Sequence, residues 1–105
     1  MTRKLSFSDE ALDDLTSIAE YIAVESASLD VARAVVSRLT ERSERLANLP
    51  GVLGTARPEL AADLRSTPEG RYILFFRYAG NLLEIVAVVH GSIDLAARFL
   101  SSDPR

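Results

Sequence analysis

The sequence predicts an α+β fold of one domain over residues 1–105, in which a hairpin of two helices packs on an antiparallel sheet. The first half of the chain holds two long segments with apolar residues at helical spacing. The second half holds two strongly apolar segments that are separated by a short turn, which is typical of a β-hairpin. We therefore expect the order βααβββ, followed by a short C-terminal helix.

The first strand and the first helix are expected at the N-terminus. Residues 3–7 alternate polar and apolar side chains, as a half-buried strand does. Ser8 is a good N-cap residue and Asp9 follows it in the first helical turn, so a helix should begin here and end between residues 25 and 28. Its apolar residues recur every three or four positions and should lie in the core: Leu12, Leu15, Ile18 and Ile22.

A second helix is expected between Asp30, as its N-cap, and Pro50-Gly51, which ends it. Its apolar stripe consists of Val31, Val35, Leu39 and Leu46. Arg38, Arg42 and Arg45 should lie on its solvated flank. The short break between the two helices favours an antiparallel helical hairpin.

The second half of the chain predicts three strands. They are expected at residues 62–67, 71–78 and 82–90, after a connecting loop over residues 50–61 and with turns at 67–70 and 79–81. Residues 85–89 are apolar at every position, which predicts a strand in the middle of the sheet, buried on both sides. Leu95 and Phe99 would share one face of the last helix.

The hairpin at residues 71–90 is apolar on both of its faces. A small domain has few elements with which to cover both, so we expect a second polypeptide to cover one of them. The C-terminal segment is the alternative cover, and the sequence leaves this open. Because neighbouring arginines repel each other, an anionic partner between Arg65 and Arg71 is also expected. The candidate partner-binding residues are Arg65, Arg71, Ile73, Phe75 and Arg77.

Composition narrows the classes of function. The chain has no cysteine, which excludes disulfides and thiolate metal sites, and we expect neither a metal nor another cofactor. Its formal net charge is −3, whereas proteins that grip nucleic-acid phosphates usually carry excess cations. The sequence shows neither a secretory signal nor a membrane-spanning run, so we expect a cytoplasmic protein without a membrane partner.

Four stretches in the second half, taken in order, resemble the RelE/ParE toxin superfamily, and most of all its ParE branch of plasmid-stabilisation toxins. They are Arg57-Pro58-Glu59-Leu60, Leu64-Arg65-Ser66, residues 70–77 and residues 84–91. The pattern often continues with a small residue, Arg and Asp, where this chain has Ser92-Ile93-Asp94. The resemblance implies a toxin of a type II toxin–antitoxin system that arrests growth by inhibiting DNA gyrase through protein contact. It also implies neutralisation by a cognate antitoxin, with no direct DNA binding in the antitoxin's absence.

Two alternatives remain open at the level of sequence. Nuclease members of the superfamily cleave mRNA on the ribosome, and for that chemistry the resemblance offers Glu59, Arg65, Arg71 and His90, with His90 as general acid. The simpler interpretation of His90 is a strand-end histidine that hydrogen-bonds nearby backbone. The second alternative is an inactive antitoxin-binding remnant, which Ile93 in place of arginine keeps open.

Overall fold

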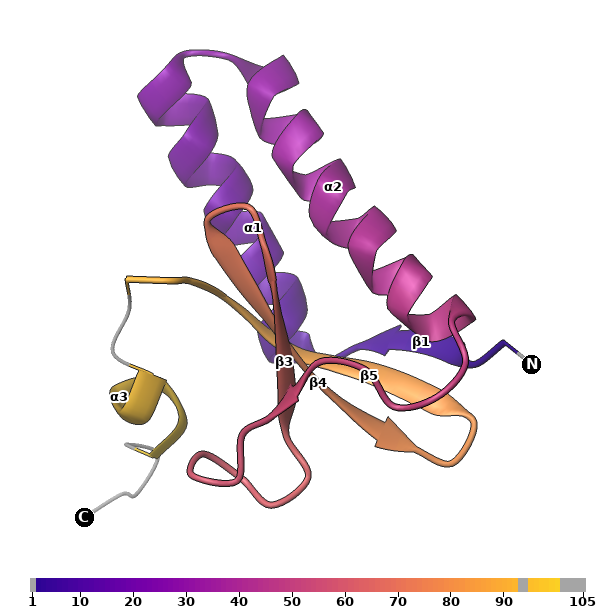
Figure 1. Cartoon of the computed structure of the whole chain (residues 1–105). Coiled ribbons are helices and arrows are strands. Elements are labelled where there is room, and N and C mark those ends of the chain that lie inside the picture. The colour runs from indigo at the N-terminus through magenta and orange to yellow at the C-terminus, as the bar shows by residue number, and fades with distance from the viewer. Residues whose placement is uncertain (1, 93–94, 101–105) are drawn as a thin grey trace.

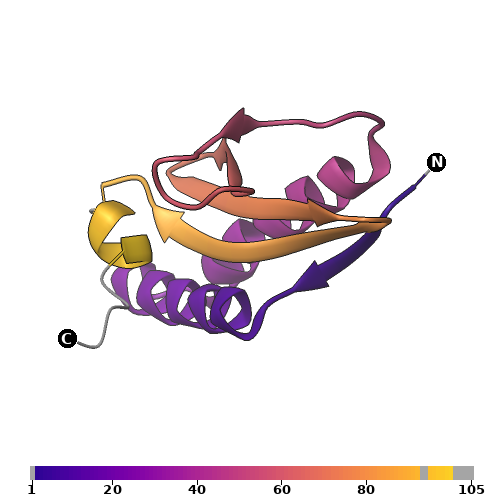
Figure 2. The same cartoon turned by 90° about the horizontal axis from the view of Figure 1, so that it is seen from below.

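The computed structural model describes residues 2–92 and 95–100, and within them it confirms the expected α+β fold (Figure 1). The elements are β1 (Lys4–Phe7), α1 (Asp9–Ser26), α2 (Leu29–Asn48), β2 (Thr55–Ala56), β3 (Arg65–Glu69), β4 (Tyr72–Ala79), β5 (Leu82–His90) and α3 (Leu95–Leu100). The two long helices form a hairpin on one face of the sheet, and α3 lies near the end of β5 (Figures 1 and 2). The expected order of elements is confirmed, with the two-residue strand β2 added inside the connecting loop.

The sheet has the order β1-β5-β4-β3-β2. Neighbouring strands are antiparallel except β1 and β5, which are parallel and pair Lys4 with Leu82 and Phe7 with Ile85. The sheet is therefore mixed, whereas the sequence had led us to expect a wholly antiparallel sheet. A tight turn would force β1 to run antiparallel to its neighbour, but β1 and β5 are joined through the helices and the rest of the sheet, so either direction is open to it.

Both long helices begin at a serine. The hydroxyl oxygen of Ser8 accepts a hydrogen bond of 3.0 Å from the Ala11 backbone N–H, which confirms Ser8 as the N-cap of α1. The expectation that Asp30 caps α2 is wrong, because Ser28 takes this place and accepts a bond of 3.2 Å from the N–H of Val31. Asp30 lies instead in the first turn, where a carboxylate stabilises the positive end of the helix dipole.

The third strand begins later than its sequence suggests. β3 starts at Arg65 rather than at residue 62 and runs through Pro68 to Glu69, so the turn to β4 falls at residues 70–71. Proline is tolerated here because β2 pairs only with Arg65 and Ser66, which leaves Pro68 on the edge of the sheet. The Thr67–Gly70 turn predicted from the Pro-Glu-Gly sequence is therefore wrong by about two residues.

A β-bulge interrupts β5 opposite β4. Phe75 pairs with Ala87 but Phe76 pairs with Ile85, so Val86 is the extra residue. Since side chains alternate along a strand, the extra residue reverses which face each later residue occupies. Ile85 packs against the helices before the bulge and Val88 does so after it, while Ala87 packs on the opposite side.

Each face of the sheet carries its own hydrophobic core. The helix-side core contains Ala11, Ile18, Leu39, Leu46, Ala47, Leu74, Phe76, Leu83, Ile85 and Val88. Leu12 was expected there, but its side chain is 49% exposed. The opposite face, here called the far face, contains Phe75, Ala87 and Val89, covered by Leu60 and Leu64 and by Leu95 and Phe99 of α3.

We had expected a second polypeptide to cover one face of the hairpin at residues 71–90. This expectation is wrong for the middle of the far face. Phe75 is 0% exposed, and its ring centroid lies 4.6 Å from that of Phe99. The chain uses its own loop and its own last helix to shield the far face, which is the alternative that the sequence left open.

Candidate partner-binding groove

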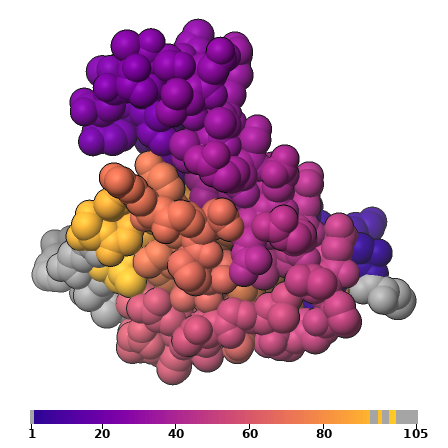
Figure 3. All heavy atoms as spheres, turned by 45° about the horizontal axis from the view of Figure 1, so that its top comes forward, coloured from indigo at the N-terminus to yellow at the C-terminus, as the bar shows by residue number. Residues whose placement is uncertain are grey.

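A groove of about 800 Å³ lies between the free end of the helical hairpin and the end of the sheet where β3 turns into β4. Figure 3 shows it as a hollow between the indigo-to-purple hairpin and the orange and yellow segments below. Its walls are mainly apolar side chains of α1 and α2, and its floor is built from β4 and β5. The apolar lining consists of Ile18, Tyr21, Ile22, Val31, Val35, Leu39, Tyr72, Val88 and Val89.

The groove is open because the hairpin rises beyond the β3–β4 turn (Figure 1). Side chains at its end therefore have no sheet residue to pack on. Tyr21 is 63% exposed and Val31 is 46% exposed, and both line the groove. Exposed apolar groups gathered in a concave surface are typical of a binding site rather than of a solvated face.

The rim of the groove is cationic although the protein is acidic. Arg38 of α2 and Arg71 of the β3–β4 turn both line it and are exposed. Among the described residues neither of them forms an ion pair, whereas Arg98 of α3 is paired with Asp14 at 2.7 Å. The groove thus combines an apolar surface with two guanidinium groups that can donate hydrogen bonds to the carboxylates of a ligand.

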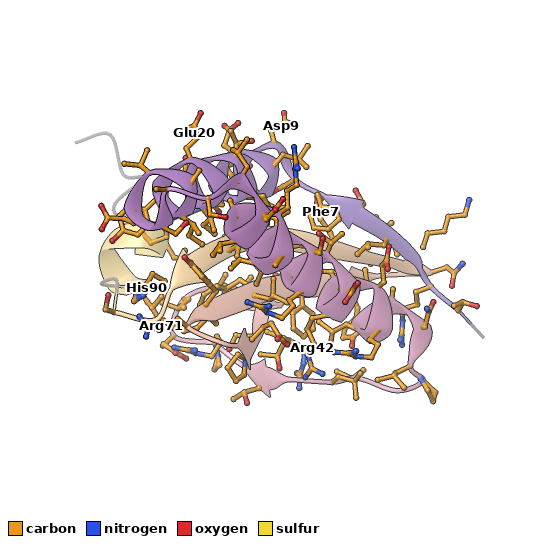
Figure 4. The ribbon with its side chains drawn as sticks, turned by 90° about the horizontal axis from the view of Figure 1, so that it is seen from above. Phe7, Asp9, Glu20, Arg42, Arg71 and His90 are labelled. Carbon is orange, nitrogen blue, oxygen red and sulfur yellow. The ribbon has the colours of Figure 1, made fainter. Side chains whose placement is uncertain are left out.

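His90 lies at the same end of the groove as Arg71 (Figure 4). Its Nδ1 accepts a hydrogen bond of 3.2 Å from the backbone N–H of Ser92 and lies 2.8 Å from the Ser92 hydroxyl. A ring nitrogen that accepts a bond from an N–H carries no proton, so Nε2 holds the proton of the neutral ring. The ring also meets that of Tyr72 edge-on, with centroids 5.5 Å apart. The contacts with Ser92 make His90 a brace for the segment that leaves β5.

Tyr72 forms part of the floor beside His90. Burial raises the pKa of its phenol, the neighbouring Tyr21 raises the pKa further, and the guanidinium of Arg71 partly offsets the rise. The phenol is therefore neutral over the physiological range and can donate a hydrogen bond to a ligand in the groove.

Arg65 holds the connecting loop and does not lie next to Arg71. Its Nε donates to the carbonyl of Leu53 at 2.7 Å, and its Nη2 donates to the carbonyl of Gly54 at 2.9 Å. Arg65 is the first residue of β3 and pairs with Phe76 of β4. Arg71 lies in the turn that joins β3 to β4, at the other end of this strand pair. The expected cross-strand neighbourhood of the two arginines is wrong for that reason.

Arg77 and Glu84 face each other across β4 and β5. The Nε of Arg77 lies 3.5 Å from the carboxylate of Glu84, and its Nη1 lies 3.7 Å from that of Asp63. This arginine therefore ties the hairpin to the loop before β3.

Glu59 forms an ion pair of 2.8 Å with Arg57, whose hydrogen bond lowers the pKa of the glutamate. The guanidinium of Arg57 lies 5.7 Å from the ring centroid of Phe75, over the far face.

Of the four residues considered for nuclease chemistry, the structure brings Arg71 and His90 to one groove. It places Glu59 and Arg65 elsewhere, each bonded to its own loop.

The residues of the helical hairpin were missed as site residues at the level of sequence. Val31 and Val35 were assigned to a core stripe and Arg38 to a solvated flank, yet all three line the groove. The length of the apolar stripe on α2 could have indicated the groove. The stripe begins in the first turn of α2, and a sheet that packs on the other end of this helix cannot cover that turn.

Within residues 2–92 and 95–100, no group of three or more histidine or acidic side chains is placed so that it could hold a metal ion. The helices in the described part of the chain are also too short or too polar to cross a membrane.

The family model described as "ParE toxin of type II toxin-antitoxin system, parDE" matches residues 5–95. The chain belongs to this ParE toxin family. It is thus a toxin of the type II toxin–antitoxin class within the ParE/RelE superfamily, and the resemblance read from its sequence is confirmed. None of the curated proteins matches the sequence of this chain.

Solved structures agree with the family at the level of fold. The chromosomal ParDE system of P. aeruginosa contains a chain that is 20% identical, with a TM-score of 0.72, and the match covers 85% of this ParE chain and 96% of that chain. The toxin–antitoxin complex RelBE2 of Mycobacterium tuberculosis contains one that is 24% identical, with a TM-score of 0.60, and the match covers 89% and 95% respectively.

Proposed function

We propose that this ParE protein arrests growth by inhibiting DNA gyrase through protein contact, and that a cognate antitoxin neutralises it by direct binding. The match to the ParE family over residues 5–95 carries the proposal. The ParDE system of P. aeruginosa and the RelBE2 complex of Mycobacterium tuberculosis, two similar structures, are toxin–antitoxin systems, which supports a partner of this kind. Since gyrase acts on the chromosome, the proposed place of action is the cytoplasm.

The groove is the proposed antitoxin site. A polypeptide segment with an apolar stripe fits the wall that includes Val31 and Val35, in the manner of an amphipathic helix laid in a hydrophobic groove. Arg38 and Arg71 at the rim favour a segment whose stripe is flanked by acidic residues. Of the partner-binding residues expected from the sequence, Arg71 belongs to this surface.

The remaining partner-binding candidates would form a second contact, away from the groove. Ile73 is half-buried and lines a smaller hollow beside β2, while Phe75 lies beneath α3. Arg65 and Arg77 hold loops through the bonds described above. A partner that uses this second surface would engage Ile73 and the outer parts of the arginines first.

Inhibition by contact is favoured over mRNA cleavage because of where the candidate acid–base groups lie. Concerted proton transfer requires the acid, the base and the cations to surround one scissile phosphate. Here His90 is bonded to Ser92, and Glu59 is bonded to Arg57 in a different part of the chain. We expect no DNA binding by the toxin without its antitoxin, since its net charge is −3.

Two parallel assays test this proposal. The purified chain is added to a gyrase supercoiling reaction and to an in-vitro translation reaction with a defined mRNA. We expect loss of supercoiling with intact mRNA. Cleaved mRNA with normal supercoiling would instead establish the nuclease alternative, and neither effect, together with retained antitoxin binding, would establish the inactive remnant.

A further inference from the structure

The outer edge of β1 is open. β1 pairs with β5 on one side, and Figure 2 shows no other segment of the described chain beyond it. The backbone N–H groups of Lys4 and Ser8 donate hydrogen bonds of 2.8 and 2.9 Å to carbonyls next to and within β5. Because the backbone groups of successive strand residues point to opposite sides, the N–H and C=O groups of Leu5 and Phe7 point away from the sheet.

These outward groups are unpaired. Within residues 2–92 and 95–100, no hydrogen bond reaches the outward N–H or C=O of Leu5 or Phe7. The side chains of both residues are half-buried and pack against the helix-side core, which fixes the strand in place. A fixed strand with unpaired backbone groups is a template on which another strand can pair.

The opposite edge of the sheet is protected against such pairing. β2 is only two residues long and pairs with Arg65 and Ser66, and beyond it the edge passes to Pro68, which has no N–H to donate. A further strand therefore has little backbone to pair with on that side. An assembly that uses β1 of each copy would stop at two copies.

β1 is complementary to a second copy of itself in one antiparallel register. When Ser6 lies opposite Ser6 of the second copy, Leu5 lies opposite Phe7 on each side of the twofold axis. Each such pair exchanges two N–H···O=C bonds, so that every outward group of both strands is satisfied. The apolar side chains of Leu5 and Phe7 then meet as a cross-strand pair on the helix side of the sheet.

Charge favours the same register. Lys4 then lies opposite Ser8 of the second copy, next to Asp9 and Glu10 in the first turn of α1. Lys4, Asp9 and Glu10 are exposed, and within the described part of the chain none of them is in an ion pair. Pairing of the two strands therefore brings a free cation of each copy to free carboxylates of the other.

We propose that this chain forms a homodimer in which the two β1 strands pair antiparallel about a twofold axis at Ser6, so that the two sheets become one. The contact is the same on both copies, as a twofold interface requires. The lining of the groove includes no residue of β1, so both grooves of the dimer stay open to the antitoxin. The proposal goes beyond the proposed function and does not depend on it, because it needs only the edge of β1.

A disulfide tests the register, because the chain has no cysteine of its own. The Cα atoms of the two Ser6 residues would be about 4.5 Å apart, as in any pair of this kind, which is within the range of a disulfide. Lys4→Cys is the matched control, since the two positions would lie about 13 Å apart along the strands although Lys4 is more exposed than Ser6. Each variant of the whole chain is incubated in a glutathione redox buffer and run on a non-reducing gel.

We expect Ser6→Cys to form a disulfide-linked dimer and Lys4→Cys to form at least about tenfold less of it. Equal cross-linking of the two variants would indicate random collision and would overturn the register. Sedimentation equilibrium of the wild type, which has no thiol, should give twice the mass of one chain. A monomeric mass at every concentration up to the millimolar range would overturn the dimer.

Lys4→Glu sets a carboxylate beside Asp9 and Glu10 of the second copy and should raise the dissociation constant of the dimer by about tenfold. Arg33→Glu makes the same charge change at the exposed free end of the hairpin and should leave this constant within about twofold. An unchanged constant in Lys4→Glu would contradict the charge pairing.

The cognate antitoxin is the other candidate for this edge, and the same cross-link distinguishes the two. Cross-linking of Ser6→Cys should continue when the antitoxin is added before the oxidant. Loss of the cross-link would assign the edge of β1 to the antitoxin and overturn the homodimer. If the antitoxin does not bind at all, the proposed function fails, while the cross-link and the mass of the free protein still decide the dimer.

Discussion

Ser8 and Val86 are 78 residues apart in the sequence, and a hydrogen bond of 2.8 Å from the Ser8 hydroxyl to the Val86 carbonyl joins them. The same hydroxyl oxygen accepts from Ala11 at the start of α1. Val86 is the extra residue of the bulge in β5. One serine therefore caps the first helix and supplies a partner for the carbonyl of the bulge.

Ser8→Ala is expected to lower the free energy of unfolding by about 2 kcal/mol, since it removes a helix cap and also leaves the Val86 carbonyl without its partner. Urea denaturation measures this. Ser28→Ala is the control, because the hydroxyl of Ser28 caps α2 without reaching the sheet, and it should cost about 1 kcal/mol. Equal losses in the two variants would contradict the second role of Ser8.

Gly54 has a positive φ of 73°, and a Cβ built on it would lie 2.7 Å from both the Phe76 ring and the Ser66 carbonyl. Gly51 has a similar φ of 81° but nothing within 4 Å of such a Cβ. Alanine at either position carries the cost of a left-handed backbone, about 1 kcal/mol. Gly54→Ala should lose clearly more in thermal unfolding than Gly51→Ala, and equal melting temperatures would argue against the close packing of this loop on Phe76.

Charge reversal at the rim tests the groove as the antitoxin site. Arg38→Glu and Arg71→Glu should each weaken antitoxin binding by about tenfold, because each replaces an attraction for acidic residues by a repulsion. Calorimetric titration gives the affinity. Arg45→Glu makes the same charge change at the far end of α2, outside the groove lining, and should leave the affinity within about twofold. If the three variants bind the antitoxin with equal affinity, the groove is not part of the interface.

The pKa of Tyr72 is raised by burial, so the folded protein keeps the proton of this phenol to a higher pH than the unfolded chain does. Above the usual pKa of about 10 the unfolded state loses this proton first, and stability falls as the pH rises further. Tyr72→Phe removes this contribution. The unfolding free energy of the wild type relative to that of the variant should therefore decrease between about pH 9 and pH 11, and a constant difference would contradict the burial.

His90→Ala should leave growth arrest intact if His90 only braces the segment after β5 through Ser92. The readout is the growth rate after induction, with circular dichroism to verify the fold. His90→Asn is the companion variant, because its side-chain oxygen can still accept the Ser92 N–H but cannot act as a general acid. Loss of toxicity in both folded variants would indicate catalysis.

The sequence identified every long element because the periodic patterns of apolar residues are strong there. The Ser8 cap follows from the local rule for helix starts, and it is present. The Ser28 cap was missed and Asp30 was chosen in its place, because both residues lie in the same short turn and are equally good caps, and propensity alone does not choose between them.

The bulge at Val86 could not be predicted from the sequence. Every residue from Ile85 to Val89 is apolar, so no alternation of polar and apolar residues shows which face each side chain occupies. The groove was missed for a related reason. Apolar stripes show which helix face is buried but not how far the sheet extends beneath it, so Val31 and Val35 resemble core residues. The cover of the far face by Phe99 likewise depends on tertiary packing that a local pattern does not encode.

The most direct test of the account is the growth of cells in which this chain is induced alone or together with its cognate antitoxin. We expect arrest when the chain is induced alone and normal growth when both are present, with the rescue lost in an Arg38→Glu/Arg71→Glu toxin that still arrests growth. Normal growth with the folded chain alone would contradict its role as a toxin, and full rescue of the double variant would contradict the role of the groove.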